Sequence, residues 1–447
     1  MSTPSPMPLR AVVVGLGRTG LSVARFLLAQ GARVAVTDSR SAPPELAALQ
    51  ALAADVVIRT GGFDAALLEQ ADLVVVSPGV PPSGPFFEAA RERGLSIVGD
   101  IELFARAARA PVIGITGTNG KSTVTSLLAQ MAARSGMQVR AGGNLGPPAL
   151  DLLAAGVKLY ILELSSFQLE TTTSLALAAA AVLNVSPDHL DRYASVQAYA
   201  AAKARIYARC DVAVINLDDP LVAAMVGPGQ RQLSFSLRSD VGADYALMRR
   251  TQGDWWLTRR AEPLLACADL RLSGLHNAAN ALAALALAEA LGLPRAACLA
   301  AMRDFPGLPH RTQWVAEIGG VRYINDSKGT NVGATLAAVS GMPGPLIVIA
   351  GGDGKGQDFV PLRAAFAGKV RAVVLIGRDA SALATALQGV SELHHAADLD
   401  AAVLKAMRLA RSGDSVLLSP ACSSLDMFRD YAQRGQAFAD AVQRRSA

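Results

Sequence analysis

Two glycine-rich loops have the residue types and spacing of phosphate-binding sites. The first, Gly15-Leu16-Gly17-Arg18-Thr19-Gly20, is a G-x-G-x-x-G directly after an apolar run. The second is Gly117-Thr118-Asn119-Gly120-Lys121-Ser122-Thr123. Glycines let the backbone approach a phosphate closely, and the N–H groups that open a following helix attract its negative charge. One chain with two such loops is therefore predicted to bind two phosphorylated ligands.

The second loop predicts an ATP site with an associated Mg²⁺ ion. Backbone N–H groups would cradle the phosphates, Lys121 would reach the terminal phosphates, and the Ser122 hydroxyl could ligate the metal. The usual G-x-x-x-x-G-K-[ST] pattern has glycine where this chain has Ile115, so the loop is a shortened variant. The expected nucleotide contacts in this loop are Gly117, Thr118, Asn119, Gly120, Lys121, Ser122 and Thr123.

The first loop leaves the identity of its ligand open. Asp38 ends the second apolar run at the distance expected for a dinucleotide site, and the Ser77-Pro78-Gly79 loop could lie beside it. Another diphosphate, such as a nucleotide sugar, would bring the same pyrophosphate to that helix end. A third interpretation is a glycine turn that only packs a helix on a strand.

Candidate metal ligands and catalytic groups follow two later apolar runs. Glu163 ends the run 159–163, at a position where Mg²⁺ often finds a carboxylate, although it could also be a solvated or capping residue. His189 lies in Asp188-His189-Leu190-Asp191-Arg192-Tyr193, and it could be a metal ligand, a base or a cap. Lys203 lies on a predicted helix, where local pattern alone favours a solvated surface lysine.

Two polar loops in the last third of the chain combine a lysine with the end of a predicted strand. They are Asn325-Asp326-Ser327-Lys328 and the glycine-rich segment 351–356, which contains Lys355. A lysine at a strand end suits a phosphate or a carboxylate. The alternative is a tight loop with an exposed lysine.

The elements that would position these residues alternate in the manner of repeated βαβ units, which predicts an α/β fold with parallel sheets. We expect three domains: residues 1–99, 100–307 and 308–447. The predicted strands are 11–14, 33–37, 56–58 and 73–77 in the first domain, 112–116, 159–163, 180–184 and 212–216 in the second, and 323–325, 346–350, 372–376 and 416–419 in the third.

Composition excludes several classes of protein. A chain of 447 residues, 51% apolar and 18% charged, is neither a small disulfide-stapled module nor disordered. Its net charge of +5 comes from scattered basic residues, which gives little support for nucleic-acid binding. The four distant cysteines fit a reducing compartment. No signal peptide is recognisable, and the longest apolar stretch is shorter than the ~20 residues of a membrane span. We therefore expect a cytoplasmic protein with no nucleic-acid or membrane partner.

The complete set of motifs resembles the ATP-dependent Mur ligase family, and the resemblance covers essentially the whole chain. It is carried by the second glycine loop and by further blocks at 143–146 (GNLG), 163–170 (ELSSFQLE), 188–193 (DHLDRY), 201–203 (AAK), 274–280 (GLHNAAN), 308–311 (LPHR), 325–328 (NDSK), 351–356 (GGDGKG) and 419–428 (SPACSSLDMF). The blocks at 163–170, 188–193 and 419–428 are similar to those of the members that add D-glutamate.

This resemblance implies a Rossmann-like N-terminal domain that binds UDP, a central P-loop ATPase-like domain and a Rossmann-like C-terminal domain. The first glycine loop would then bind the UDP of UDP-N-acetylmuramoyl-L-alanine rather than NAD. The residues implied for this substrate are Gly17, Arg18, Thr19, Asp38, Ser39, Arg40, Ser77 and Asn144. Those implied for D-glutamate are Lys328, Thr330, Lys355, Ser424, Leu425 and Tyr431, the last at a position where the family often has Phe.

For the cofactor, the resemblance implies ATP contacts from Asn277, Asn280 and Arg311, with His310 at the edge. It also implies two Mg²⁺ ions, one held by Ser122 and Glu163, the other by His189 and a carbamoylated Lys203. Carbamoylation has a physical reason, because an ammonium group cannot ligate Mg²⁺ whereas a carbamate supplies carboxylate-like oxygens. Lys121, His189 and Lys203 would be the catalytic residues of a monomeric enzyme.

The expected reaction is peptide-bond formation in peptidoglycan precursor synthesis, by phosphorylation of a carboxylate and attack of an amine on the acyl phosphate. Opening and closing of domains is expected with it. Three alternatives stay open: a sister ligase that adds another amino acid, a nicotinamide-dependent dehydrogenase, and a non-catalytic protein that binds a UDP-sugar.

Overall fold

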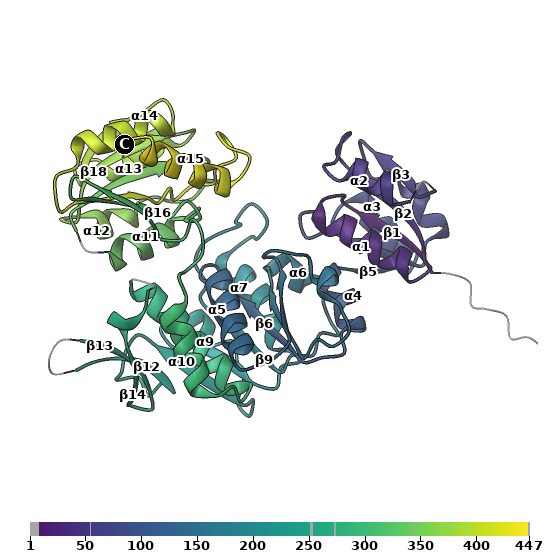
Figure 1. Ribbon diagram of the computed structural model, residues 1–447. Coiled ribbons are helices and arrows are strands. Elements are labelled where there is room, and N and C mark those ends of the chain that lie inside the picture. The colour runs from purple at the N-terminus through teal and green to yellow at the C-terminus, as the bar shows by residue number, and fades with distance from the viewer. Residues whose placement is uncertain (1–8, 54, 251–253, 272–273, 343, 446–447) are drawn as a thin grey trace, which may run out of the picture.

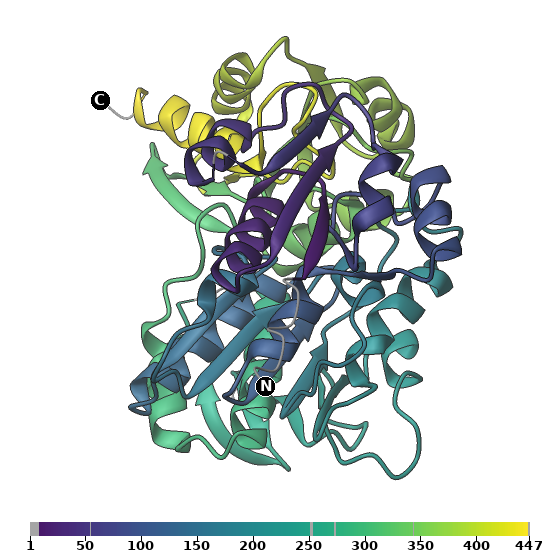
Figure 2. The same ribbon diagram turned by 90° about the vertical axis from the view of Figure 1, so that its right-hand side faces the viewer.

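Three β-sheets, each covered by helices, divide the molecule into three lobes (Figure 1). The computed structural model describes residues 9–53, 55–250, 254–271, 274–342 and 344–445. In both views the N-terminal and C-terminal lobes lie at the same end of the molecule, above the central lobe (Figure 1 and Figure 2). The α/β class predicted from the sequence is confirmed.

The N-terminal lobe is a five-stranded parallel sheet in the order β3-β2-β1-β4-β5. Runs of valine form its inner strands because β-branched side chains pack well in a sheet buried on both faces. The strand order reverses between β1 and β4, which opens a crevice at their carboxyl ends. The elements are β1 (Arg10–Val14), α1 (Arg18–Ala29), β2 (Arg33–Asp38), α2 (Leu46–Leu52), β3 (Val57–Thr60), the 3₁₀ helix η1 (Ala65–Gln70), β4 (Leu73–Val76), α3 (Pro85–Glu92) and β5 (Ser96–Val98).

The central lobe is built on a nine-stranded sheet in the order β14-β13-β12-β11-β10-β9-β6-β8-β7. Its elements are α4 (Asp100–Ala107), β6 (Val112–Thr116), α5 (Lys121–Arg134), β7 (Val139–Gly143), η2 (Ala149–Leu152), β8 (Leu159–Glu163), α6 (Ser166–Glu170), β9 (Ala179–Val182), α7 (Val196–Ala204), η3 (Arg205–Tyr207), β10 (Ala213–Asn216), α8 (Pro220–Ala223), β11 (Gln232–Ser236), β12 (Tyr245–Arg249), β13 (Trp255–Arg259), β14 (Glu262–Ala266), η4 (Cys267–Asp269), α9 (Leu275–Ala290) and α10 (Arg295–Asp304).

The C-terminal lobe has a six-stranded sheet in the order β15-β16-β20-β17-β18-β19. Its elements are β15 (Gln313–Ile318), β16 (Val321–Asn325), α11 (Val332–Gly341), β17 (Leu346–Gly351), α12 (Leu362–Phe366), β18 (Val370–Ile376), α13 (Ala380–Leu387), β19 (Glu392–His395), α14 (Leu399–Leu409), β20 (Ser415–Leu418) and α15 (Tyr431–Gln443). The parallel strands β16, β20 and β17 are neighbours, so the loops that follow them meet at one edge of the sheet.

Each strand expected from the sequence is present, and antiparallel strands extend the parallel sheets at two edges. The segment β12–β14 extends the central sheet as an antiparallel meander, and β15 pairs antiparallel with β16. Most residues of these short strands are exposed or half-buried, so the strands give a weaker signal than a continuous apolar run. The last strand of the meander carries Pro263, opposite Thr258.

The three sheets fall within the predicted ranges 1–99, 100–307 and 308–447, whose exact limits stay a prediction. The lobes share an apolar core: Leu21 and Leu27 of α1 belong to the same buried cluster as Leu150 and Leu152 of η2. Within the described ranges, no helix combines the length and the hydropathy that a membrane crossing requires.

Candidate active site

A cavity of about 620 Å³ lies between the crevice of the N-terminal lobe and the loop after β7. We call it the carrier cavity, after the UDP-linked carrier substrate expected to bind there. All eight residues that the resemblance assigns to the UDP substrate line it, namely Gly17, Arg18, Thr19, Asp38, Ser39, Arg40, Ser77 and Asn144, together with Gly15, Pro78, Gly79, Val80, Gly143, Gly146, Pro148 and Gln168. The structure therefore brings this predicted set together.

The first glycine loop places the start of α1 against this cavity. A Cβ atom on Gly20 would overlap the carbonyl oxygen of Gly15, so the helix can begin this close to the turn only with glycine. The Arg18 guanidinium donates to the carbonyl oxygen of Gly146 in the central lobe at 3.1 Å. The positive end of a helix and an arginine thus face the same space, which suits a diphosphate.

Asp38 is committed to interactions within the protein. Its carboxylate accepts hydrogen bonds from the backbone N–H of Leu16 at 2.6 Å and from the guanidinium of Arg40 at 2.7 and 2.9 Å. Burial by itself would raise the pKa of Asp38, but the hydrogen bonds from Arg40 and Leu16 outweigh it and lower the pKa to about 2. Asp38 is therefore charged at neutral pH and fixes both the glycine turn and the Arg40 side chain.

The second glycine loop is held in shape by the neighbouring strand end. Asn184 accepts a hydrogen bond from the N–H of Asn119 at 2.8 Å and donates to the carbonyl of Asn119 at 3.1 Å. The N–H of Thr118 donates to the Asn184 carbonyl at 2.9 Å. Gly120 is left-handed with φ of 84°, and a Cβ atom there would overlap Oδ1 of Asn280. The loop thus needs glycine at this position.

Lys121 and Lys203 converge on one backbone oxygen. The Lys121 ammonium donates to the carbonyls of Gly117 and Thr118, both at 2.8 Å, and Lys203 donates to the same Gly117 oxygen at 3.0 Å. Burial lowers the pKa of Lys121. Burial and the nearby Lys121 charge hold the pKa of Lys203 well below its usual range. The local expectation of a solvated Lys203 is wrong, because only 1% of the residue is exposed.

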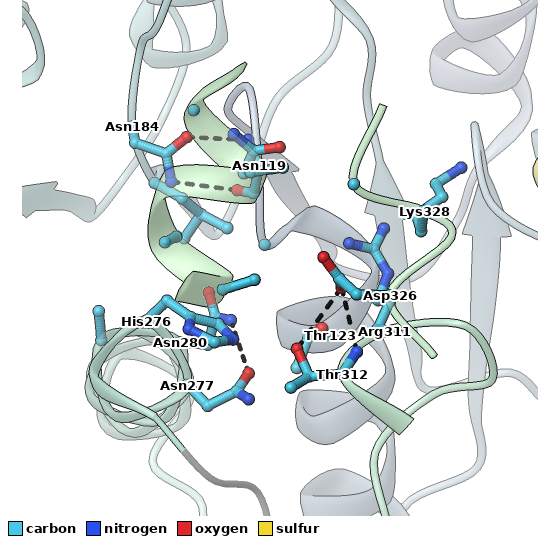
Figure 3. Close-up of a pocket in the computed structure, with 18 of the residues that line it drawn as sticks. Asn119, Thr123, Asn184, His276, Asn277, Asn280, Arg311, Thr312, Asp326 and Lys328 are labelled. Carbon is cyan, nitrogen blue, oxygen red and sulfur yellow. Dashed lines mark hydrogen bonds between the residues drawn. The ribbon is translucent and has the colours of Figure 1, made fainter. Parts of the chain in front are cut away.

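A second cavity, of about 300 Å³, lies where the central and C-terminal lobes meet; we call it the nucleotide cavity. Figure 3 shows Asn277 and Asn280 on α9 at one side, with Arg311 and Lys328 opposite. The predicted nucleotide contacts Asn119, Gly120, Thr123, Asn277, Asn280 and Arg311 all line it. Gly117, Thr118, Lys121 and Ser122 belong to the adjoining loop and are not part of its lining.

Two hydrogen bonds connect the phosphate loop and its neighbouring carboxylate with the C-terminal lobe and the carrier cavity. Arg311 donates to the Ser122 hydroxyl at 2.8 Å, so a C-terminal-lobe arginine touches the phosphate loop. Asn144 of the carrier cavity donates to Oε1 of Glu163 at 2.6 Å. The other carboxylate oxygen of Glu163 is buried and has no hydrogen-bond partner among the described residues. A buried, unpartnered carboxylate oxygen next to the phosphate loop suits Mg²⁺, which prefers oxygen ligands.

His189 and Lys203 lie beside a group of aromatic rings. The His189 ring packs edge-on against Phe167 at 4.9 Å, and the Lys203 ammonium lies 4.2 Å from the centre of the Tyr199 ring. Burial lowers the pKa of His189, which favours the neutral imidazole that metals bind. The described residues contain no cluster of three or more His, Cys, Asp or Glu suited to a metal. The proposed metal ligands therefore stay predictions.

The residues predicted to receive D-glutamate lie on the loops after β16, β17 and β20 and, for Tyr431, at the start of α15. Lys328 lines the nucleotide cavity, and its ammonium stacks 3.6 Å from the centre of the Tyr431 ring. Burial and the charge of Arg311 lower the pKa of Lys328 to about 7. Thr330 follows in the same loop, half-buried. Tyr431, which stands where the family often has Phe, is thus in contact with the amino group of Lys328.

The remaining predicted residues of this lobe lie outside both cavities. Lys355 is exposed with φ of 51°, Ser424 is buried, and Leu425 is 67% exposed. The ring of His310 contacts α15: its Nδ1 lies 3.0 Å from the amide nitrogen of Asn325, and the ring packs against Gly435. None of these four residues lines either cavity, but Lys355 is close enough to the site that, besides burial, its charge lowers the pKa of His189.

Several residues of the site were missed by sequence reasoning. Asn184 ends a predicted strand without being predicted as a site residue, and Gln168 and Asp326 belong to motifs without a predicted role of their own. Asp326 is buried, accepts from the Thr312 N–H at 3.0 Å and from the Ser419 hydroxyl at 2.8 Å, and lines the nucleotide cavity. Burial raises the pKa of Asp326 to about 6. A polar residue just after a buried strand was the signal available for Asn184 and Asp326, whereas Gln168 lies in the following helix.

Three family models match the chain in order. They are the Mur ligase MurD-like N-terminal domain over residues 9–99, the Mur ligase middle domain over 115–288 and the Mur ligase glutamate ligase domain over 310–422. The chain belongs to the Mur ligase family.

Curated relatives match over nearly the full length. A protein of Nitrosococcus oceani named UDP-N-acetylmuramoylalanine–D-glutamate ligase is 58% identical, with 97% of this chain and 96% of the relative covered. A protein of Methylobacillus flagellatus with the same name is 54% identical, with the same coverage. The interpretation of the first glycine loop as a dehydrogenase site is therefore wrong.

Solved structures share the fold at low sequence identity. The UDP-N-acetylmuramate-alanine ligase MurC of Thermotoga maritima superposes with a TM-score of 0.62 at 20% identity, covering 98% of this chain and all of that one. A pseudomurein peptide ligase type C from Methanothermus fervidus gives a TM-score of 0.61 at 17% identity, covering 98% of this chain and 99% of that one.

Proposed function

We propose that the protein is an ATP-dependent ligase that joins D-glutamate to UDP-N-acetylmuramoyl-L-alanine in peptidoglycan precursor synthesis. The N-terminal lobe binds the UDP carrier, the central lobe binds ATP, and the C-terminal lobe receives the amino acid. The relatives at 58% and 54% identity that carry this name support the proposal.

The observation that carries the proposal is the hydrogen bond from Asn144 to Glu163. It joins the wall of the carrier cavity to the carboxylate beside the phosphate loop at 2.6 Å. A substrate anchored by its UDP in the first cavity therefore extends toward the place where the terminal phosphate of ATP lies. A dehydrogenase or a protein that only binds a UDP-sugar does not require a link between the UDP site and an ATP site.

The reaction proceeds in two steps. A carboxylate oxygen of the L-alanine arm takes the terminal phosphoryl group of ATP, releasing ADP and leaving an acyl phosphate. The amine nitrogen of D-glutamate then attacks the carbonyl carbon, the C–O bond breaks, inorganic phosphate departs with the electron pair, and the amine loses a proton. Lys121 and Arg311 offset the negative charge that gathers on the transferring group.

Two Mg²⁺ ions are proposed to accompany ATP, and they would supply further charge compensation. The free carboxylate oxygen of Glu163 and the Ser122 hydroxyl suit one ion. The other requires His189 and a modified Lys203, since an ammonium cannot be a ligand. The burial and lowered pKa of Lys203 support carbamoylation, because a neutral amine adds to CO₂, forming an N–C bond and releasing one proton.

The proposed reaction is tested by measuring phosphate release from ATP with UDP-N-acetylmuramoyl-L-alanine present, with and without D-glutamate. Release that requires both acceptors supports the proposal, and a panel of amino acids in place of D-glutamate distinguishes a sister ligase. Lys121→Ala should abolish turnover; a non-catalytic carrier-binding protein would keep its function. Incorporation of ¹³C-bicarbonate, detected by NMR in the native enzyme but not in Lys203→Arg, tests the carbamate.

We also propose that the enzyme acts as a monomer in the cytoplasm, without nucleic-acid or membrane partners. One chain supplies all three ligand regions, which supports the monomer. Light scattering at working concentrations tests it, and a dimer mass would contradict it.

A further inference from the structure

Asp100 is a buried acid that the proposed reaction does not use. It is the first residue of α4, directly after the chain leaves the N-terminal lobe, and it is 1% exposed. No cation pairs with it among the residues that the structure describes, and its Oδ1 has no hydrogen-bond partner there. Burial raises the pKa of Asp100 to about 6. Because a buried carboxyl without a cation costs stability, its presence points to another role.

The side-chain partner of Asp100 is Gln168, which lies on α6. Nε2 of Gln168 donates to Oδ2 of Asp100 at 3.1 Å. Gln168 is only 3% exposed, yet it lines the carrier cavity together with Asn144. Asp100 therefore contacts a wall residue of the cavity from behind.

The other end of the Gln168 amide is fixed as well. Its Oε1 accepts from the backbone N–H and the hydroxyl of Ser165, at 3.0 and 3.2 Å, in the capping box that begins α6. A primary amide has two N–H donors and one oxygen with two lone pairs. Both lone pairs and one N–H are thus used within the protein. The second N–H is what Gln168 has left for a ligand in the carrier cavity.

We propose that Asp100 is a positioning residue for the carrier substrate: it locks the Gln168 amide so that its second N–H donates to an acceptor oxygen of the muramoyl-alanine arm. The inference rests on the proposed function. The Ser165 N–H only donates and an ionised carboxylate only accepts, so together they hold the amide in one orientation from its two ends, whereas an asparagine at position 100 could also turn a donor toward Gln168 and weaken that hold. The arm is the relevant part of the carrier because Gln168 lines the same cavity as Asn144, which donates to Glu163 beside the phosphate loop.

The test is calorimetric binding of UDP-N-acetylmuramoyl-L-alanine to the full-length enzyme, combined with KM values for the carrier and for ATP. Asp100→Asn should weaken carrier binding about tenfold and raise the carrier KM in proportion, with the ATP KM unchanged, as expected for the loss of one oriented hydrogen bond. In the double variant with Gln168→Ala, the loss should be no greater than in Gln168→Ala alone, because both act through one amide.

Asp100→Ala keeps the inference testable if the asparagine variant folds poorly. Removing an uncompensated buried acid should leave the melting temperature equal or higher while carrier affinity falls, a combination that a purely structural role does not give. Glu102→Gln is the matched control. Glu102 lies in the same turn of α4 at 2% exposure and accepts from the N–H groups of Thr173 and Ser174, without contact to Gln168. This variant should lose stability but keep carrier affinity.

Wild-type enzyme that does not bind the carrier would overturn the proposed function itself. Wild-type binding with equal affinity in both Asp100 variants would overturn only the present inference, and so would additive losses from Asp100→Asn and Gln168→Ala.

Discussion

At the scale of single residues, the site holds the Lys121 ammonium with backbone carbonyls instead of carboxylates. Lys121 donates to the Gly117 and Thr118 oxygens and forms no ion pair among the described residues. A carbonyl orients an ammonium group without cancelling its charge. The positive field at the phosphate loop is therefore kept for an anionic ligand, and Arg311 and Lys328 add to it from the C-terminal lobe.

Asn184 is the single side chain that most directly shapes the phosphate loop. Asn184→Ala removes two hydrogen bonds to Asn119, and at about 1 kcal/mol each the affinity for ATP should fall roughly tenfold to thirtyfold. Isothermal titration with a non-hydrolysable ATP analogue measures this. Asn184→Asp keeps the acceptor and should show the smaller loss. Unchanged ATP affinity in the alanine variant would disprove the role.

Lys328 should make stability depend on pH. Its pKa is lowered to about 7 in the folded protein, so between pH 7 and 10.5 the unfolded chain binds more protons. Unfolding free energy should therefore rise with pH across this window through this group, by up to about 1.4 kcal/mol per pH unit. Lys328→Met should abolish that rise, as measured by urea denaturation at pH 7.5 and 9. Lys158→Met, at an exposed position, controls for a change of charge alone.

At the scale of elements, helix α5 is bounded by two glycines with the same backbone conformation and different surroundings. Gly120 before it has φ of 84° and a Cβ atom there would overlap Asn280, whereas Gly136 after it has φ of 80° and open space around it. Backbone strain is common to both positions. Only the first adds a steric conflict inside the nucleotide cavity.

This pair gives a matched comparison. Gly136→Ala should cost about 1 kcal/mol of stability through its positive φ and leave ATP binding intact. Gly120→Ala carries the same strain plus the overlap, and kcat/KM for ATP should fall about a hundredfold. Thermal unfolding and steady-state kinetics distinguish the two effects. Equal activity losses in both variants would mean that backbone strain alone is responsible.

The sequence predicts the inner strands and the two glycine loops, because continuous apolar runs and glycine spacing are local signals. The strands that escape prediction are β5, β7, β11, β12 to β15 and β19. They are short or largely half-exposed, and several contain glycine or polar residues, so they lack such a run. Lys203 shows the same limit at the site: helical position alone suggests exposure, and only the packing of α7 under the phosphate loop buries it. The link between Asp100 and Gln168 joins two helices far apart in sequence and has no local signature.

At the scale of the whole molecule, the central and C-terminal lobes are in contact at two glycines, Gly274 and Gly341. His276 of α9 packs between Gly274 and Gly341, the last residue of α11, and burial lowers its pKa to about 4. The neutral ring lines the nucleotide cavity. Contact between the two lobes therefore completes one wall of that cavity.

Gly341→Ala should hinder this contact. Its Cβ atom would lie 3.2 Å from both the Gly274 Cα and the Nδ1 of His276. We expect a larger radius of gyration in small-angle scattering with ATP and both substrates present, and an ATP KM raised about tenfold. Gly227→Ala, where a Cβ atom meets nothing within 4 Å, is the control. A scattering profile identical to that of the ligand-saturated wild type would contradict the expectation.

The proline in the outermost strand of the central sheet has a consequence for crowded solutions. A sheet grows by adding strands to the N–H and C=O groups of its open margin. Pro263 has no N–H to offer there, and Glu262 next to it adds a charge. Both features disfavour the addition of another chain to this side of the nine-stranded sheet.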